Sequence, residues 1–141
     1  MRVVEVITAF GHENIRASHT TTLEITKEKE LTVRGDCIIA VSADKGLLDL
    51  KPEFRNFIRN ENARLTIFID ASGLTDVVEA FGSPKLIFSH PADMVVRKSG
   101  YVCGRTLAIH ANKAACDLSR ALVKKLQNPE QSVKITLSVE V

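Results

Sequence analysis

The amino-acid sequence predicts a mainly β domain of the α+β class, a compact pseudo-symmetric β-sandwich or barrel-like fold with about eight strands and two helices. Three observations support this prediction: short segments in which apolar and polar residues alternate, only two segments with helical spacing, and a match between the two halves of the chain. Because 141 residues are enough to bury one hydrophobic core, we expect a single domain over residues 1–141.

The strands are expected from period-two alternation and from short runs rich in β-branched residues. The last segment, "SVKITLSVEV", alternates without interruption, and "ARLTIFIDAS" does so at Leu65, Ile67 and Ile69. Several other runs are apolar on both faces, as buried strands are. In chain order these runs are "RVVEVITAF", "TTLEIT", "DCIIAVSA", "TDVVEAF", "KLIFS", "DMVVRK" and "RTLAIH".

Two segments are expected to form helices. The first covers residues 49–60, where a proline lies near the first turn and apolar residues such as Phe54 face inward. The second covers residues 112–127, with Asn112 as the N-cap and Pro129 just beyond the end.

The two halves of the chain resemble each other. "VITAFG" at Val6–Gly11 returns as "VVEAFG" 71 positions later, and "AVSADKGLLDL" matches "AIHANKAACDL" at an offset of 68. We therefore predict an internal duplication with two βββαβ repeats, approximately residues 3–72 and 74–141. A unit this short cannot bury its own apolar face, so the two repeats should close on each other about a pseudo-twofold axis.

Some polar and glycine positions are the same in both halves. Gly11 and Gly82 correspond, at a step where a tight turn or a positive φ would require glycine. His19 and His90 also correspond, and packing and hydrogen bonding at strand ends explain such a pair more simply than catalysis. The alternative is that the twofold axis brings both histidines into one symmetric site.

Function is expected where the two halves differ. These positions include His12, His110 and the pair Cys37 and Arg105, which roughly face each other in the alignment. If a homodimer became one chain, such residues would be free to acquire a new role.

Charge is uneven along the chain, although the net charge is only +2. Residues 97–125 contain seven basic side chains and one acidic side chain. A helix N-terminus after "HANKA" could bind a phosphate or carboxylate with help from these cations. The expected ligand-binding residues are His12, Arg97, Lys98, Arg105, His110, Asn112 and Lys113. The alternative is a solvated helix face whose counter-charges fold beside it.

Three function classes remain open from the residues. The first is a protein that binds a phosphate-bearing or other anionic small molecule at the strand-to-helix turn of the second half. The second is a small enzyme, with or without a metal ion, in which His12 or His110 is the acid–base group. The third is a module that binds nucleic acid through its backbone, without aromatic stacking because tryptophan is absent and tyrosine occurs once.

Other chemistry has little support in the sequence. The spacing of the histidines and cysteines matches no metal-site pattern, so no metal site and no particular cofactor are predicted. Three cysteines, with no C-x-x-C pair, favour a reduced cytoplasmic setting. No apolar run reaches the roughly 18 residues that a membrane span requires, so no membrane association is expected.

Three long segments carry a resemblance to a known family: "GHENIRASHTTTLEIT", "LTVRGDCIIAVSADKG" and "VRKSGYVCGRTLAIHANKAACDL". Over nearly its whole length the chain resembles an archaeal protein family catalogued as a domain of unknown function. The resemblance implies an archaeal cytoplasmic protein with a compact, mainly β, sandwich-like fold. It implies no activity and no catalytic residue.

Overall fold

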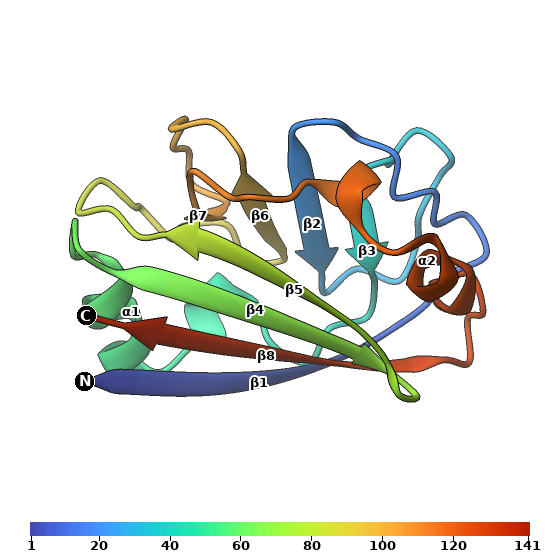
Figure 1. Cartoon of the computed structure of the whole chain (residues 1–141), viewed down its shortest axis with the longest axis horizontal. Helices are drawn as coiled ribbons and strands as arrows, with labels where there is room; N and C mark the ends of the chain where they lie inside the picture. The colour runs from blue at the N-terminus through green and yellow to red at the C-terminus, as the bar shows by residue number, and fades with distance from the viewer.

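The computed structural model describes residues 1–141 as two four-stranded β-sheets and two short α-helices (Figure 1). The predicted mainly β fold is confirmed, and of its two forms the structure adopts the sandwich, because the sheets do not close into a barrel. The elements in chain order are β1 (Arg2–Phe10), β2 (Thr22–Thr26), β3 (Ile38–Ala40), the 3-10 turn η1 (Leu47–Asp49), α1 (Pro52–Ile58), β4 (Arg64–Ala71), β5 (Leu74–Phe81), β6 (Asp93–Arg97), β7 (Thr106–Ala108), η2 (Ala115–Asp117), α2 (Arg120–Leu126) and β8 (Ser132–Glu140).

The first sheet is antiparallel, with the strand order β1-β8-β4-β5. Burial alternates along β1 and β4, as the period-two pattern predicts, so one face of this sheet is covered and the other is open. The two chain ends lie side by side at one end of the sheet, where the Val141 amide donates to the Met1 carbonyl at 3.1 Å (Figure 1).

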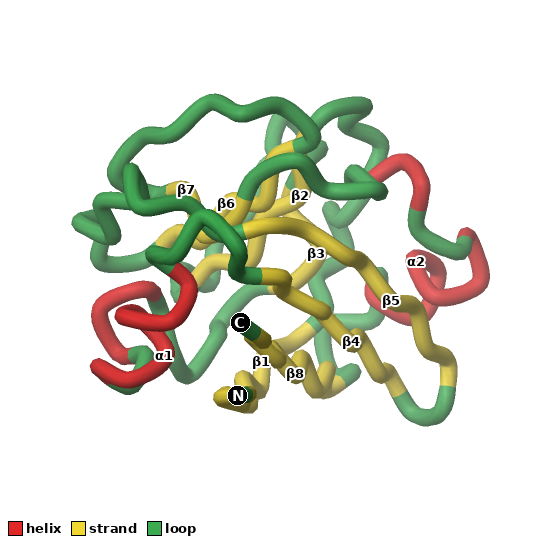
Figure 2. The backbone as a smooth tube through the Cα atoms, turned by 60° about the vertical axis from the view of Figure 1, so that its left-hand side comes forward, coloured by secondary structure: helices red, strands yellow, loops and turns green.

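The second sheet has the order β3-β2-β6-β7, with β2 and β6 antiparallel at its centre and each paired in parallel with an outer strand. The hydrophobic core lies between the sheets, and α1 and α2 lie at opposite ends of the sandwich (Figure 2). Two isolated bridges, Phe10 to Val41 and Phe81 to Ile109, join the edges of the sheets. Neither helix is long and apolar enough to cross a membrane.

The two halves have the same order of elements: three strands, a 3-10 turn, a helix and a strand. When each strand is replaced by its equivalent from the other half, the strand order of each sheet is the same order read backwards. A pseudo-twofold axis therefore passes between β4 and β8 and between β2 and β6. This arrangement supports the expected βββαβ pattern, and an origin by duplication stays a prediction.

The helices differ from the expected ranges. No helix begins at Asn112, because the chain first makes the turn η2 and α2 starts only after Ser119, whose hydroxyl accepts from the Leu122 amide at 3.4 Å. The predicted N-cap role of Asn112 is therefore wrong. The first helix is likewise shorter than residues 49–60 and begins at Pro52.

Gly11 and Gly82 are glycines for a different reason from the expected one. Neither has a positive φ. A Cβ atom at Gly82 would overlap the Ile58 carbonyl oxygen at the end of α1, and one at Gly11 would overlap the carbonyl oxygens of Leu126, the last residue of α2, and of Asn128 just beyond it. The glycines therefore allow β5 and β1 to pass close to the C-terminal ends of the helices.

The segment "KLIFS" is not a strand, although Leu86 and Phe88 are buried; Ile87 between them is exposed. Arg59 holds it instead: its guanidinium donates to the carbonyl oxygens of Leu86 and Ile87 at 3.1 and 3.0 Å and lies over the Phe88 ring. These two carbonyl groups therefore have a side-chain hydrogen-bond donor without belonging to a β-ladder.

Candidate functional site

The seven residues predicted to bind a ligand lie at several places on the surface. His110 and Asn112 line one hollow, Arg97 ends β6, and Arg105 lies in the turn just before β7. Lys98 and Lys113 are used in ion pairs, and His12 lies beside the end of α2, where its amide donates to the Leu126 carbonyl at 2.9 Å. The structure therefore does not gather them around one helix N-terminus.

The lysines of the "SADKG" and "HANKA" turns face carboxylates rather than solvent alone. Lys113 pairs with Asp76, and Lys45 pairs with Glu5 at 3.0 Å in the equivalent position. Lys98 pairs with Asp117 at 2.7 Å. These pairs support the expectation that counter-charges fold beside the basic residues, and they leave fewer free cations for a phosphate or a nucleic acid.

Replacing Lys45 with methionine is expected to lower the free energy of unfolding by about 2 kcal/mol, because the Glu5 carboxylate, with a side chain only 2% exposed, would stay buried without its cation. Lys98→Met is the control: its ion pair with Asp117 is exposed, so we expect little change. Urea denaturation followed by circular dichroism measures both. Equal losses in the two variants would contradict the structural role of Lys45.

His19 and His90 make the same contacts in the two halves. The Nδ1 atom of His19 accepts from the amides of Thr21 and Thr22, and that of His90 accepts from the amides of Ala92 and Asp93, at distances of 2.9–3.2 Å. The imidazoles thus satisfy amide groups at the start of β2 and β6. This geometry favours the structural interpretation of the pair.

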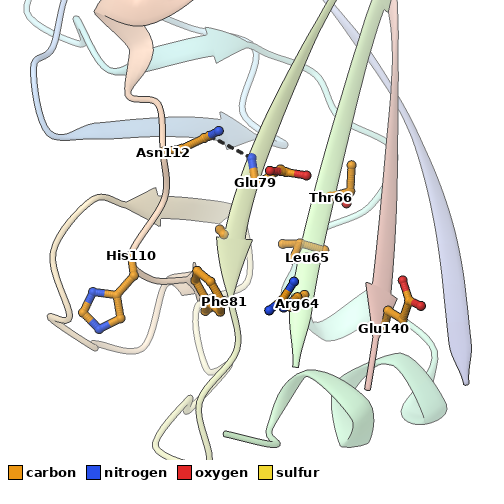
Figure 3. Close-up of a pocket in the computed structure, with 9 residues that line it drawn as sticks. Arg64, Leu65, Thr66, Glu79, Phe81, His110, Asn112 and Glu140 are labelled. Carbon is orange, nitrogen blue, oxygen red and sulfur yellow. Dashed lines mark hydrogen bonds between the residues drawn. The ribbon is translucent and has the colours of Figure 1, made fainter. Parts of the chain in front are cut away.

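Asn112 pairs with the edge of the first sheet. Its backbone amide donates to the Glu79 carbonyl oxygen at 2.9 Å. Its side-chain Oδ1 accepts from the Glu79 backbone amide at 2.9 Å (Figure 3). Asp44 does the same with Thr8 in the first half.

Beside Asn112 is a hollow of about 280 Å³ on the open face of the first sheet. Its lining residues are Arg64, Leu65, Thr66, Glu79, Ala80, Phe81, His110, Asn112 and Glu140.

The most perturbed ionisable groups lie on the outer face of the second sheet. Glu24, on β2, is 5% exposed, and its carboxylate has only long polar contacts. The Cys37 thiol donates to its Oε1 at 3.7 Å, and an Arg105 nitrogen lies 3.9 Å from the same oxygen. A buried carboxyl group with such weak contacts is costly to ionise.

Asp93, on β6, completes this group. Its Oδ1 accepts from the Thr26 hydroxyl at 2.8 Å, and its Oδ2 lies 3.3 Å from Arg105 Nη1 and 3.8 Å from His90 Nε2. We call Glu24, Cys37, Asp93 and Arg105 the Glu24 cluster. It draws two residues from each half of the chain.

Burial and the neighbouring Asp93 raise the pKa of Glu24 from 4.5 to about 7, against the opposing effect of Arg105. Burial, together with the Glu24 carboxyl, also raises the pKa of the Cys37 thiol to about 11. Glu24 therefore changes protonation near neutral pH, whereas Cys37 stays a thiol there and is no nucleophile.

A second cysteine, Cys103 in the connection between β6 and β7, has the opposite electrostatics. Cys103 receives a contact from the Arg97 guanidinium at 3.3 Å and from the Thr106 hydroxyl at 3.7 Å. Burial alone would raise the pKa of this thiol, but the Arg105 amide, the Thr106 hydroxyl and the Arg97 charge together lower it.

Iodoacetamide near neutral pH is expected to alkylate Cys103 at least about tenfold faster than Cys37, because only Cys103 has a stabilised thiolate. Peptide mass spectrometry after timed quenching measures both rates. Arg97→Gln should slow the reaction of Cys103 and leave Cys37 unchanged. Equal rates at the two sites in the native protein would contradict these electrostatics.

Sequence patterns alone offer little reason to choose Glu24. It lies between Leu23 and Ile25 in a strand and has the ordinary position of a solvated polar residue. One signal was available: at the offset of 71, Glu24 corresponds to Val95, which is also its cross-strand partner. A position that is valine in the second half is thus a carboxylate in the first half.

Metal binding finds no support in the side-chain arrangement. No group of three or more histidine, cysteine, aspartate or glutamate side chains is placed to hold a metal ion. The histidines at positions 12, 19, 90 and 110 are not gathered, and three of them, His12, His19 and His90, use Nδ1 as an acceptor for backbone amides.

The chain is similar to a known protein family and to a protein of another organism. The model of a family described as "Domain of unknown function (DUF371)" matches residues 7–140. An uncharacterized protein of Methanocaldococcus jannaschii is 46% identical over 128 residues, which cover 91% of this chain and 94% of that protein. Neither match carries a described activity.

Proposed function

We propose that this chain, which belongs to the DUF371 family, is a small acid–base enzyme that acts on an anionic substrate at the Glu24 cluster. The observation that carries the proposal is the Glu24 carboxyl group, buried on the outer face of a sheet with only weak contacts to its oxygen atoms. Such a group lowers stability, and active sites are where such costs are commonly retained.

Glu24 is the proposed proton-transfer group. With a pKa of about 7 it is present in both protonation states near neutral pH, which suits a general acid or base. This assigns the acid–base role to Glu24 in place of His12 or His110. The adjacent thiol of Cys37 serves as a neutral neighbour that donates to the carboxylate.

Arg105 is the proposed anion-binding group. Its side chain is 46% exposed, and its contacts with Asp93 and Glu24 use a single nitrogen atom, Nη1. The remaining N–H groups can therefore bind a carboxylate or a phosphate in a bidentate manner. This retains the predicted anionic ligand and moves it from the "HANKA" turn to the second sheet.

The proposal is tested by ligand-induced shifts in melting temperature with sulfate, oxalate and pyruvate, anions whose charge is constant between about pH 6 and 8. We expect at least one to raise the melting temperature of the wild type. Lys98→Gln, which removes another paired surface cation, should keep the shift, and Arg105→Gln should lose it. A shift that persists in Arg105→Gln would contradict the proposed binding site.

The role of Glu24 is tested through the pH dependence of the same shift. Near pH 6 the carboxyl group is largely neutral and does not repel the anion, whereas near pH 8 it is ionised and does. The shift should therefore be larger at the lower pH, and Glu24→Gln should abolish this difference. A difference that survives in Glu24→Gln would place the proton-transfer group elsewhere.

A further inference from the structure

The hollow beside β5 contains charged side chains that no other part of the protein neutralises (Figure 3). Arg64 lies between Glu140 on β8 and Phe81 on β5 in the strand register, and Glu79 faces Thr66. None of Arg64, Glu79 and Glu140 forms a side-chain hydrogen bond or an ion pair within 4.0 Å, unlike Lys27, Lys45, Lys98 and Lys113. One cation and two anions are thus free to bind a ligand.

The opposite end of the same sheet shows which of these residues the fold requires. Asp44 occupies the position equivalent to Asn112, and Phe10 the position equivalent to Phe81, and both halves make the same edge contacts there. These edge contacts therefore explain why Asn112 and Phe81 stand at their positions, before any role in ligand binding is considered.

The charged residues of the hollow have no such counterparts. At the same offsets Glu79 corresponds to Thr8 and Arg64 to Ser132, which are neutral. Their charges are therefore not needed to build this edge of the sandwich, and they occur together at one end only.

We propose that this hollow binds a small zwitterion of the α-amino acid type. The guanidinium of Arg64 binds the ligand carboxylate, and the carboxylates of Glu79 and Glu140 bind its ammonium group. The Phe81 ring, 41% exposed, offers an apolar surface for the ligand side chain. His110 takes no part, because its imidazole points away from the other lining side chains (Figure 3).

The size and the charge of the hollow both fit this ligand class. Its volume of about 280 Å³ is just below the range of about 300–1,000 Å³ that is typical of sites for drug-sized ligands, which favours a small molecule. A simple anion would meet two carboxylates, and a simple cation would leave Arg64 unpaired. Only a ligand with both charges satisfies all three groups. This site lies on the other sheet from Glu24 and is independent of the function proposed there.

The test is a titration of ¹⁵N-labelled protein with L-alanine, followed by two-dimensional NMR. Propionate and ethylamine are the matched probes, because each has a similar carbon skeleton and only one of the two charges. We expect L-alanine to shift the amide signals of β4, β5 and Asn112, with an affinity at least about tenfold higher than that of either probe.

Variants locate the binding. Arg64→Gln and Glu79→Gln should each weaken L-alanine binding by about tenfold or more. Lys134→Gln, an exposed charge on the same face towards the other end of the sheet, should leave it unchanged. The spectrum of each variant reports directly that it is folded. Equal binding of the three probes, no shifted signals, or unchanged binding in both hollow variants would overturn the proposal.

Discussion

Gly82→Ala is expected to prevent stable folding. The added Cβ would overlap the Ile58 carbonyl oxygen and lie 2.9 Å from Ala63 Cβ. Neither neighbour can move easily, because the Ile58 carbonyl accepts from the Ser83 amide and the Ala63 carbonyl accepts from the Gly82 amide, both at 3.0 Å. Relieving the overlap would separate β5 from α1. A loss of more than about 4 kcal/mol is expected, which is a large part of the stability of a small domain.

Gly73→Ala is the matched control for this prediction. Gly73 has a φ of +88°, but a Cβ there would meet no atom within 4 Å. Only backbone strain opposes the substitution, so we expect a loss of about 1 kcal/mol. Thermal and urea unfolding followed by circular dichroism measures both variants. If Gly82→Ala were no less stable than Gly73→Ala, the close approach of β5 to α1 would be disproved.

Glu24→Gln is expected to remove a large pH dependence of stability. The folded state holds the pKa of Glu24 at about 7, above its ordinary value of 4.5, because burial disfavours the carboxylate. For a raised carboxyl pKa, the folded protein binds the proton more tightly than the unfolded chain. Stability contributed by this group is therefore full below about pH 4.5 and is lost as the pH rises through about 7.

The size of this effect follows from the two pKa values. A change from 4.5 to about 7 corresponds to a loss of about 3 kcal/mol between acid and mildly alkaline pH. Glutamine has the shape of the neutral acid and does not ionise, so the variant should lack this loss and be the more stable protein near pH 8. Urea unfolding at several pH values, with the exposed Glu13→Gln as control, measures the difference. Parallel curves for Glu24→Gln and the wild type would show that Glu24 titrates normally.

Much of the architecture could be predicted from local patterns. Alternation and short β-branched runs predicted nine strand segments, and all eight observed strands lie on eight of them, because the side chains of a half-buried strand must face the core and the solvent in turn. The prediction of a strand at "KLIFS" was wrong because burial of Leu86 and Phe88 does not require a strand when Arg59 supplies hydrogen bonds to this segment. The prediction of Asn112 as an N-cap was wrong because an asparagine side chain can accept a hydrogen bond from a strand amide as readily as from a helix amide.

The candidate site was less predictable than the fold. Arg105 was expected for its charge, but its partners Asp93 and Glu24 carry no local signal of burial. Lys113 was expected to be free, and its pairing with Asp76 depends on a contact across 37 positions of the chain. Ion pairs and pKa shifts depend on distances in space, which neither composition nor spacing contains.

The sequence alone determined the fold class, the equivalent halves and the glycines at the ends of two strands, since periodicity and the lack of a side chain are properties of the residues themselves. Only the tertiary structure decided which charges are neutralised and which remain free. Glu24 becomes an acid with a pKa of about 7 because strands from both halves bury it beside Asp93 and leave Arg105 at the surface. That environment arises from packing between segments almost 70 residues apart in the chain.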